Sequence, residues 1–314
     1  MKRKVIKQGN DTLTITLPKK WVKKTGLKGG DEINVEELYD SLVIGNKKEE
    51  TNQEIDIDVS NLDRSTINLL IQSRYRYGYD TINILTSTPF ASHYRINKKV
   101  STSSVVYNIV NRFVGAEVVS ASEKNFVIKK ITDESIGEFE NLLRRIFRLV
   151  NEMIDSFIQG AKENNMDILE SIEFQHINLK KFINFCLRLL NKYGYEDSRK
   201  TCFYFNLISL LSKLEDIIKN HGRYVVKYSL KLKSPQFFEL LNNIKKSIND
   251  YYDLFYNYNT AKITTLNKNR DFFREHLFKY SKELSKDENI IIGGMSQIIE
   301  LIIDMTETRI ALED

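Results

Sequence analysis

The sequence predicts a multidomain α+β protein with a small β-rich head, a small α/β middle region and a long all-α body. Three observations support this prediction. Apolar residues alternate with polar ones near the N-terminus, strand-like and helix-like segments then alternate, and apolar residues finally recur at helical spacing. Only three prolines occur among 314 residues, which favours long helices.

The predicted head spans residues 1–48. Apolar residues alternate with threonines over Leu13–Leu17, a period of two that predicts a half-buried strand. Pro18 then opens a short helix, because the first helical position needs no N–H donor, and Gly26 closes it as a left-handed cap. A turn at "KGGDE" and the strands "INVEEL" and "LVIGN" complete the head. A unit this small lacks residues for a good core, so we expect two copies to pair.

The predicted middle region covers residues 53–131. Two helices, Asn61–Tyr77 and Val100–Phe113, alternate with the strands "EIDIDVS", "YDTINILT", "AEVVSAS" and "FVIKKI". Each helix ends in an aromatic residue, followed within two residues by a glycine and then a strand, which is compatible with a small α/β sandwich. We expect the segment "TSTPFASHYRINKK" to be a loop. Its hydroxyl and basic side chains are suited to an anion, and the alternative is a solvated loop.

Residues 133–314 form the predicted helical body. Apolar periodicity predicts six helices, at about 133–163, 166–193, 198–228, 234–260, 266–285 and 288–312. The gaps between them are short, so neighbouring helices are expected to run antiparallel. Six helices of this length suggest two three-helix bundles in tandem.

Basic residues concentrate in the head. Residues 1–30 carry nine basic residues and one acidic residue, whereas the whole chain carries +5, which leaves −3 for the remainder. A basic head on a near-neutral remainder indicates a polyanionic partner for the head alone.

The composition argues against several classes of protein. No run of about 18 apolar residues occurs, and the basic N-terminus lacks the apolar core of a signal peptide, so we expect a cytoplasmic protein without membrane insertion. Cys186 and Cys202 lie in apolar helical patterns and are expected to be reduced core residues. No P-loop, GxGxxG, GxSxG, HExxH or CxxC motif occurs, so we expect no catalytic residues and no enzyme.

Four lysines share one side of the predicted head helix. At about 100° per residue, an arc of roughly 140° contains Lys19, Lys20, Lys23 and Lys24. Trp21, Val22 and Thr25 fall on the opposite side. Four like charges this close repel one another and gain nothing structurally. Binding to a phosphate backbone therefore explains this face better than exposure to solvent does.

The run from Lys4 to Ile44 resembles the AbrB/MazE/SpoVT-type swapped-hairpin DNA-binding domain. The resemblance is carried by Gly9, the strand Leu13–Leu17, "LPKKW", the "GLKGGDEI" turn and the final "DSLVI" hairpin. In that family two chains interlace their hairpins into one β-barrel, which implies a homodimer that binds double-stranded DNA. Many members have Gly-Arg before the strand, whereas this chain has Gly9-Asn10-Asp11, so a base-reading arginine is absent.

The expected DNA-binding residues combine this resemblance with the charge pattern. Phosphate contacts are expected from Lys2, Arg3, Lys4, Lys7, Lys19, Lys20, Lys23 and Lys24. Base edges are expected to meet Asn10, Thr12 or Thr14.

The rest of the chain resembles archaeal PhoU-like phosphate uptake regulators. "RYGYDTINI" and "FVGAEVVSASEKNFVIKKI" are similar to the middle segment of those proteins, and the six helices resemble a PhoU domain, which is a pair of three-helix bundles. The resemblance implies a role in phosphate uptake or phosphate homeostasis. It also implies a phosphate transporter ATPase or a sensor protein as partner.

The same resemblance raises a metal site in the helical body. PhoU-type bundles carry Glu-x-x-x-Asp pairs that hold metal ions, because carboxylates four residues apart share a helix face. Glu300 and Asp304 match this pattern, but the third helix has Ser212-x-x-x-Asp216 instead. The implied site for a divalent, iron or zinc ion therefore consists of Glu300, Asp304 and Asp216. The alternative is that these carboxylates face solvent or pair with Arg309 or Lys219.

The leading hypothesis from the sequence is a cytoplasmic, homodimeric DNA-binding transcriptional regulator whose helical body acts as a sensor or partner-binding module. The alternative is a protein-interaction adaptor that regulates a phosphate transporter, with a head that serves only for dimerisation. An antitoxin is a third hypothesis, because related heads occur in antitoxins. It is disfavoured because antitoxins usually carry a short disordered inhibitory tail, whereas a folded helical body is predicted here.

Overall fold

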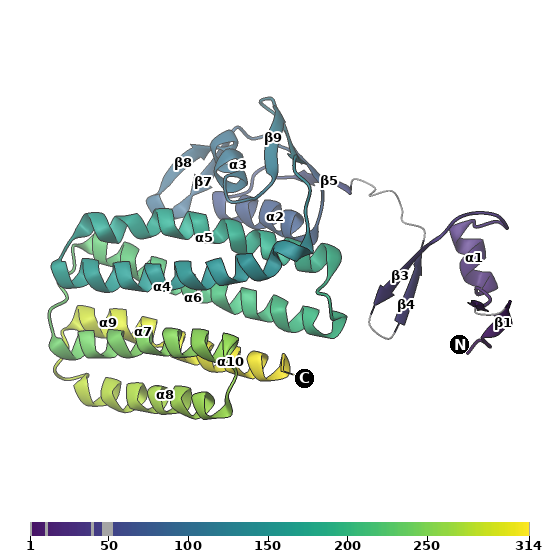
Figure 1. The fold of residues 1–314 in the computed structure, drawn as a ribbon. Helices are drawn as coiled ribbons and strands as arrows, with labels where there is room; N and C mark the ends of the chain where they lie inside the picture. Colours follow the sequence, from purple (N-terminus) through teal and green to yellow (C-terminus); the bar gives the residue numbers. More distant parts are fainter. Residues whose placement is uncertain (1, 10–11, 39–40, 46–52, 314) are drawn as a thin grey trace. The chain divides into compact units, whose positions relative to one another are not determined.

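The structure is a computed structural model, and it describes residues 2–9, 12–38, 41–45 and 53–313. Contacts within the chain divide it into two compact units, Met1–Thr51 and Asn52–Asp314. The first unit is the head, and the second contains both the middle region and the helical body. Figure 1 shows the elements of each unit.

The head contains two antiparallel hairpins and a short helix. Strand β1 (Ile6–Gln8) pairs with β2 (Thr12–Thr14), and β3 (Asn34–Leu38) pairs with β4 (Ser41–Gly45). Strand β2 ends at Thr14, earlier than the predicted Leu13–Leu17, because Thr14 lies opposite the first residue of β1 and the next residues pair with no described strand.

Helix α1 (Lys19–Thr25) confirms the predicted start and stop signals of the head. Pro18 stands at the N-cap, and Gly26 adopts a left-handed conformation at φ 73° and donates its backbone N–H to the Val22 carbonyl oxygen. Thr25 was predicted on the covered side of α1 but is exposed, and its hydroxyl donates to the Trp21 carbonyl oxygen.

The head residues whose exposure the structure describes form no buried core within one chain. None of its described residues is buried, and its apolar side chains stay largely in contact with solvent. The most exposed of them are Val5, Ile6, Leu13, Ile15, Val35 and Leu42, with exposed fractions from 48% to 69%. Strands this apolar need a second surface to cover them.

The middle region is a four-stranded sheet with helices. The strands follow the order β5 (Glu54–Asp58), β6 (Thr81–Leu85), β10 (Asn125–Lys130) and β9 (Ala116–Ala121). Strands β5 and β6 run parallel and are joined by α2 (Arg64–Tyr77), whereas the other pairs are antiparallel. Helix α2 begins after Asp63, whose carboxylate accepts hydrogen bonds from the backbone N–H groups of the first turn.

The segment expected to be a loop forms a hairpin instead. Strands β7 (Phe90–His93) and β8 (Lys98–Ser101) pair antiparallel around the single-turn helix η1 (Tyr94–Ile96). The prediction missed it because the strands are only four residues long and lack alternation. Asn97 closes η1 with a left-handed backbone, and α3 (Thr102–Val110) follows after Ser101 caps it.

The helical body contains long helices with the bounds α4 (Phe139–Glu163), α5 (Met166–Tyr193), α6 (Thr201–Tyr228), α7 (Pro235–Tyr256), α8 (Thr260–Tyr280), α9 (Lys286–Met295) and α10 (Gln297–Ala311). They follow the predicted helices, except that α8 begins and ends earlier than expected and the last predicted helix is divided into α9 and α10. Single helical turns, η2 (Ile136–Glu138) and η3 (Ser198–Lys200), precede α4 and α6.

The predicted last helix is interrupted at Ser296. The hydroxyl of Ser296 donates to the Gly293 carbonyl oxygen, and two successive glycines weaken the helix just before this point. Gly294 also lies against His221 of α6, where a Cβ atom would be 2.0 Å from the imidazole Nε2. A side chain at this position would therefore have to displace the His221 ring.

A buried carboxylate fixes the start of α9. Glu288 completes a capping box with Ser285 and also accepts hydrogen bonds from the backbone N–H groups of Lys233 and Ser234, each at 2.8 Å. Burial raises the pKa of Glu288, but these hydrogen bonds outweigh it and lower the pKa to about 2. The ionised form of Glu288 therefore stabilises the fold.

The helices share one apolar core. Helix α4 packs against α5 and α6, and α7 packs against α8, α9 and α10, while contacts of α4 with α7 and of α6 with α10 join the two sets. The middle region lies on the side of α5, where α2 packs, and α8 lies on the opposite side of the helices (Figure 1).

One stretch in the described residues meets the length and composition of a membrane span. Lys286–Ala311 has a mean hydropathy of 1.3 in its most apolar window, and 44% of that window is buried inside the protein. A buried core helix meets the same criteria, so the stretch assigns no membrane location by itself.

Candidate nucleic-acid interface and buried charge clusters

The four lysines of α1 form an exposed basic face, which we call the lysine face: Lys19, Lys20, Lys23 and Lys24. Trp21 and Val22 lie on the other side of α1 and are half-buried. Because Pro18 and Gly26 fix both ends of the helix, the face is held on seven residues of regular structure. Among the described residues, no carboxylate lies within ion-pair distance of any of these ammonium groups.

The other predicted phosphate contacts are also exposed. They are Lys2, Arg3, Lys4 and Lys7. Lys7 stands in β1 opposite Leu13, so the first hairpin holds it at a defined register position. The head thus presents eight cations without a described counter-charge, which is the electrostatic pattern of a surface that binds a polyanion.

The predicted base-contacting residues have different positions. Thr12 is exposed at the start of β2. Thr14 is half-buried, and its hydroxyl donates to the Ile6 carbonyl oxygen at 3.3 Å, which ties it to the hairpin. Asn10 lies outside the described residues.

The predicted metal ligands of α10 are not gathered with Asp216. Glu300 forms a bidentate ion pair with Arg274 of α8, with contacts from 2.7 to 3.0 Å, and Asp304 is exposed. Asp216 contacts Lys180 and Lys219 instead. The metal assignment to Glu300, Asp304 and Asp216 stays a prediction.

A different group with metal-ligating chemistry lies between α5 and α6. One ligand atom each from His176, Glu215 and Asp216 lies within 4.8 Å of the others. His176 Nδ1 lies 2.7 Å from a Glu215 carboxylate oxygen, and both side chains are buried. Burial lowers the pKa of His176, and the hydrogen bond to Glu215 offsets this only in part.

A lysine already supplies the positive charge in this group. The ammonium of Lys180 lies 2.6 Å from Glu215, 2.6 Å from the Ser212 hydroxyl and 2.9 Å from Asp216. Burial raises the pKa of Asp216, but Lys180 and Lys219 outweigh it and lower the pKa to about 2. The resemblance suggested a degenerate metal pair at Ser212 and Asp216. In this chain the ammonium group of Lys180 contacts both residues.

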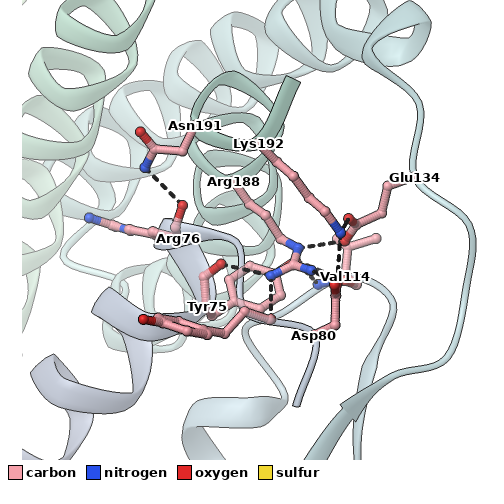
Figure 2. Close-up of polar contacts among 9 residues, drawn as sticks. Tyr75, Arg76, Asp80, Val114, Glu134, Arg188, Asn191 and Lys192 are labelled. Atoms are coloured by element: carbon pink, nitrogen blue, oxygen red, sulfur yellow. Dashed lines mark hydrogen bonds and ion pairs between the residues drawn. The ribbon is translucent and has the colours of Figure 1, made fainter. Parts of the chain in front are cut away.

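A second buried charge cluster joins the middle region to α5 (Figure 2). The Arg188 guanidinium donates to Glu134 at 2.5 Å and to Asp80 at 2.6 Å. It also donates to the carbonyl oxygens of Tyr75 and Tyr79, at 3.0 and 2.7 Å. The Arg188 side chain is 1% exposed, so these partners replace its hydration.

Lys192 balances the charge of this cluster. Its ammonium lies 2.7 Å from Asp80 and 3.4 Å from Glu134, so two cations face two buried carboxylates. Burial raises the pKa of Asp80, but Lys192 and Arg188 outweigh it and lower the pKa. Removal of one partner would leave a buried charge unpaired, so the cluster holds the middle region firmly on α5.

The two cysteines are free. Cys186 is buried, as predicted, whereas Cys202 is exposed and does not belong to the core. It lies at the second position of α6, before the apolar stripe of that helix becomes buried.

Comparison with known proteins gives a match in the head. The family described as "Antidote-toxin recognition MazE, bacterial antitoxin" matches residues 6–52. These residues therefore form a MazE/AbrB-type domain. No protein with curated annotation matches the chain.

Two solved structures are similar to part of this chain. A PhoU-like protein from Shewanella oneidensis MR-1 is 13% identical at a TM-score of 0.40, and the match covers 58% of this chain and 97% of that protein. A PhoU-like phosphate regulatory protein from the same organism is 14% identical at a TM-score of 0.38, with coverages of 55% and 96%. These values are too low to indicate a shared function.

Proposed function

We propose, from the MazE/AbrB-type domain at residues 6–52, that this protein is a DNA-binding transcriptional regulator. In this proposal two heads pair in a homodimer and bind the backbone of duplex DNA. The larger unit acts as a sensor or as a module that binds a protein partner. The proposal assigns no catalytic chemistry to the chain and places it in the cytoplasm.

The observation that carries the proposal is the uncompensated lysine face. Its four ammonium groups repel one another at neighbouring positions of one short helix, which costs free energy in the absence of a counter-charge. Phosphate groups along duplex DNA supply negative charge at close spacing and release bound cations when lysines replace them. A solvated structural surface would gain nothing from this arrangement.

The exposed apolar strands support pairing of two heads. Full burial of one aliphatic side chain stabilises a protein by roughly 1.5–3 kcal/mol. Covering six side chains that are about half exposed would therefore contribute on the order of 5 kcal/mol per chain. Interlaced hairpins, as in the family that the head resembles, would supply that cover and bring two lysine faces to one dimer.

The link to phosphate rests on sequence resemblance. Residues of the middle region and the helical body resemble archaeal PhoU-like phosphate uptake regulators. We therefore propose phosphate uptake or phosphate homeostasis as the regulated process, with a phosphate transporter ATPase or a sensor protein as partner of the larger unit.

Two rival functions use the same head. In the adaptor alternative the head only dimerises. The exposed apolar strands would explain that dimerisation equally well. In the antitoxin alternative, which the matching family favours, the chain would neutralise a toxin. Here residues 53–313 form a folded unit with two cores rather than a short disordered inhibitory segment.

A gel shift with duplex DNA at several salt concentrations tests the proposal. A DNA-binding regulator retards the duplex at low salt and loses affinity steeply as salt rises. An adaptor whose head only dimerises leaves the duplex unshifted at every salt concentration, which would reject the proposal.

A further inference from the structure

Four arginines gather where the middle region meets α5 and α6, and we call them the arginine cluster. They come from four separate segments: Arg64 at the start of α2, Arg95 in η1, Arg112 after α3, and Arg223 in α6. All four belong to the larger unit. Their convergence therefore results from the fold and not from a basic run in the sequence.

Packing brings these segments together, because α2 contacts both α5 and β7, and β7 leads directly into η1. The charges of the four arginines accordingly act on one another. Burial lowers the pKa of Arg64, and the charges of Arg112, Arg95 and Arg223 lower it further. Burial also lowers the pKa of Arg95, and Arg223 adds to that effect. His93 in β7 responds to the same guanidinium groups, because burial and then Arg64 lower its pKa.

Hydrogen bonds hold two of the four arginine-bearing segments against α5. The buried Asn184 of α5 donates to the Arg112 carbonyl oxygen at 2.9 Å and accepts from Arg76 Nε at 2.9 Å, so the end of α3 is held against α5. Arg223 bonds Glu173 of α5 at 2.7 Å. Arg223 also lines a groove of about 290 Å³ between α5 and α6, together with Lys219, Glu170 and Glu173, and the other three arginines lie outside that lining.

Three of the four guanidinium groups keep their donors available. Among the described residues, the side chains of Arg64, Arg95 and Arg112 form no hydrogen bond or ion pair. Four of the nearby carboxylates are already engaged, since Asp63 caps α2, Glu173 pairs with Arg223, and Glu215 and Asp216 pair with lysines. The fifth, Glu170, is exposed at the groove.

Among the charged groups that act on the cluster or line the groove beside it, positive charge exceeds negative charge. The cations are Arg64, Arg76, Arg95, Arg112, Arg223, Lys180 and Lys219. The carboxylates are Asp63, Glu170, Glu173, Glu215 and Asp216. The excess of two positive charges lies at a partly buried contact between elements, where repulsion is screened less than on an open surface.

We infer that the arginine cluster is a binding site for a small phosphate-type oxyanion, either inorganic phosphate or the phosphoryl group of a small metabolite. Guanidinium groups present planar pairs of N–H donors that match the oxygens of phosphate and stay charged when partly buried. A dianion would neutralise the excess charge. Arg64, Arg112 and Arg223 are half-buried, which suits a small ion better than the broad backbone of a duplex.

The inference rests on the proposed sensor role of the larger unit and gives that role a class of ligand. Binding of this ligand does not require that the head binds DNA. It lies entirely in the larger unit, whereas the lysine face lies in the head. Loss of one function therefore leaves the other measurable.

The test is isothermal titration calorimetry of the full-length chain at low ionic strength. Inorganic phosphate, adenosine 5′-monophosphate and acetate are titrated separately. The variant Arg64→Gln plus Arg95→Gln removes two unpaired guanidinium groups without breaking a described hydrogen bond of either side chain. Arg148→Gln plus Lys268→Gln removes two exposed charges from α4 and α8 and is the matched control. Lys20→Ala plus Lys24→Ala controls for binding to the head.

The inference predicts saturable binding of phosphate or adenosine 5′-monophosphate at one site per chain. Each charge-assisted hydrogen bond contributes about 1.5–3 kcal/mol, so the arginine variant should bind at least about tenfold more weakly. Both control variants should retain the wild-type affinity within about twofold. Phosphate binding identifies the free ion as a sufficient ligand, and binding of the nucleotide alone identifies a phosphoryl group on a larger molecule.

Three results would overturn the inference. They are no saturable binding of either phosphate compound, equal affinity in the wild type and the folded arginine variant, and equal binding of acetate. Circular dichroism of the variant at the titration temperature establishes that it is folded.

Discussion

The lysine face yields a quantitative prediction about salt. The change is Lys20→Ala plus Lys24→Ala, which removes two exposed ammonium groups one helical turn apart on α1. Neither side chain has an ion-pair partner in the described part of the head, and alanine is the strongest helix former. We therefore expect the change in the free energy of unfolding to stay within about 0.5 kcal/mol.

The magnitude follows from counterion release. If a dimer neutralises roughly six phosphates, the logarithm of affinity falls with the logarithm of salt at a slope of about −5. Removing two lysines per chain removes up to four contacts per dimer, which leaves a slope of about −2. Between 50 and 200 mM salt, the wild type should lose about a thousandfold in affinity and the variant only about fifteenfold.

The assay is fluorescence anisotropy of a labelled duplex titrated with the full-length chain across a series of salt concentrations. Arg148→Ala plus Lys268→Ala removes equal charge from the helical body and should keep the wild-type slope. The affinity of the lysine variant should fall by the same factor for two unrelated duplex sequences, because lysine–phosphate contacts do not read bases. An unchanged slope in that variant, or a slope near zero in the wild type, would refute the reasoning and favour the adaptor alternative.

Three further predictions concern assembly, metal and stability. Leu13→Asp should convert the full-length dimer to a monomer in sedimentation, since Leu13 is 69% exposed on an apolar strand. The control Phe278→Asp, on the exposed surface of α8, should leave the dimer intact. A dimer that survives Leu13→Asp would contradict pairing through the head. Purified protein should hold well under one tightly bound iron or zinc per chain by elemental analysis, and any tight site should be lost in Glu300→Ala plus Asp304→Ala; stoichiometric metal that survives both changes would contradict this. Glu288→Gln should lower the free energy of unfolding by about 3 kcal/mol at pH 7, because the pKa of Glu288 is lowered from 4.5 to about 2. That difference should shrink as pH falls from about 4.5 to 2, since the stability from a lowered carboxyl pKa is lost as the folded form protonates; a pH-independent difference in denaturant unfolding would refute the assignment.

The sequence predicted the elements that depend on local signals. Pro18 and Gly26 set the ends of α1, and the long apolar stripes placed α5 within the exact bounds Met166–Tyr193. These features depend on neighbours within a few residues, so they can be read from one segment at a time. The β7–β8 hairpin and the break at Ser296 were missed because contacts with distant segments determine them.

The buried charge clusters show why the site was harder to predict. Arg188 stands between Leu187 and Leu189 in an apolar stretch of α5, and this local pattern identifies no partner. Its partner Asp80 lies 108 residues earlier in the chain, and His176 and Glu215 are 39 residues apart. Charge complementarity across such separations depends on the fold. The resemblance pointed to Asp216 as a metal ligand, but it did not reveal that Lys180 of α5 donates a hydrogen bond to this carboxylate.

The central claim is that duplex DNA is bound by the head and not by the larger unit. Lysine-modification footprinting, read by mass spectrometry on the full-length chain with and without duplex DNA, tests it most directly. The account predicts that DNA protects Lys19, Lys20, Lys23 and Lys24 from modification, while the exposed Lys213 and Lys268 of the helical body stay reactive. Protection confined to lysines of the larger unit, or no protection at a salt concentration where the duplex is retarded, would contradict the claim.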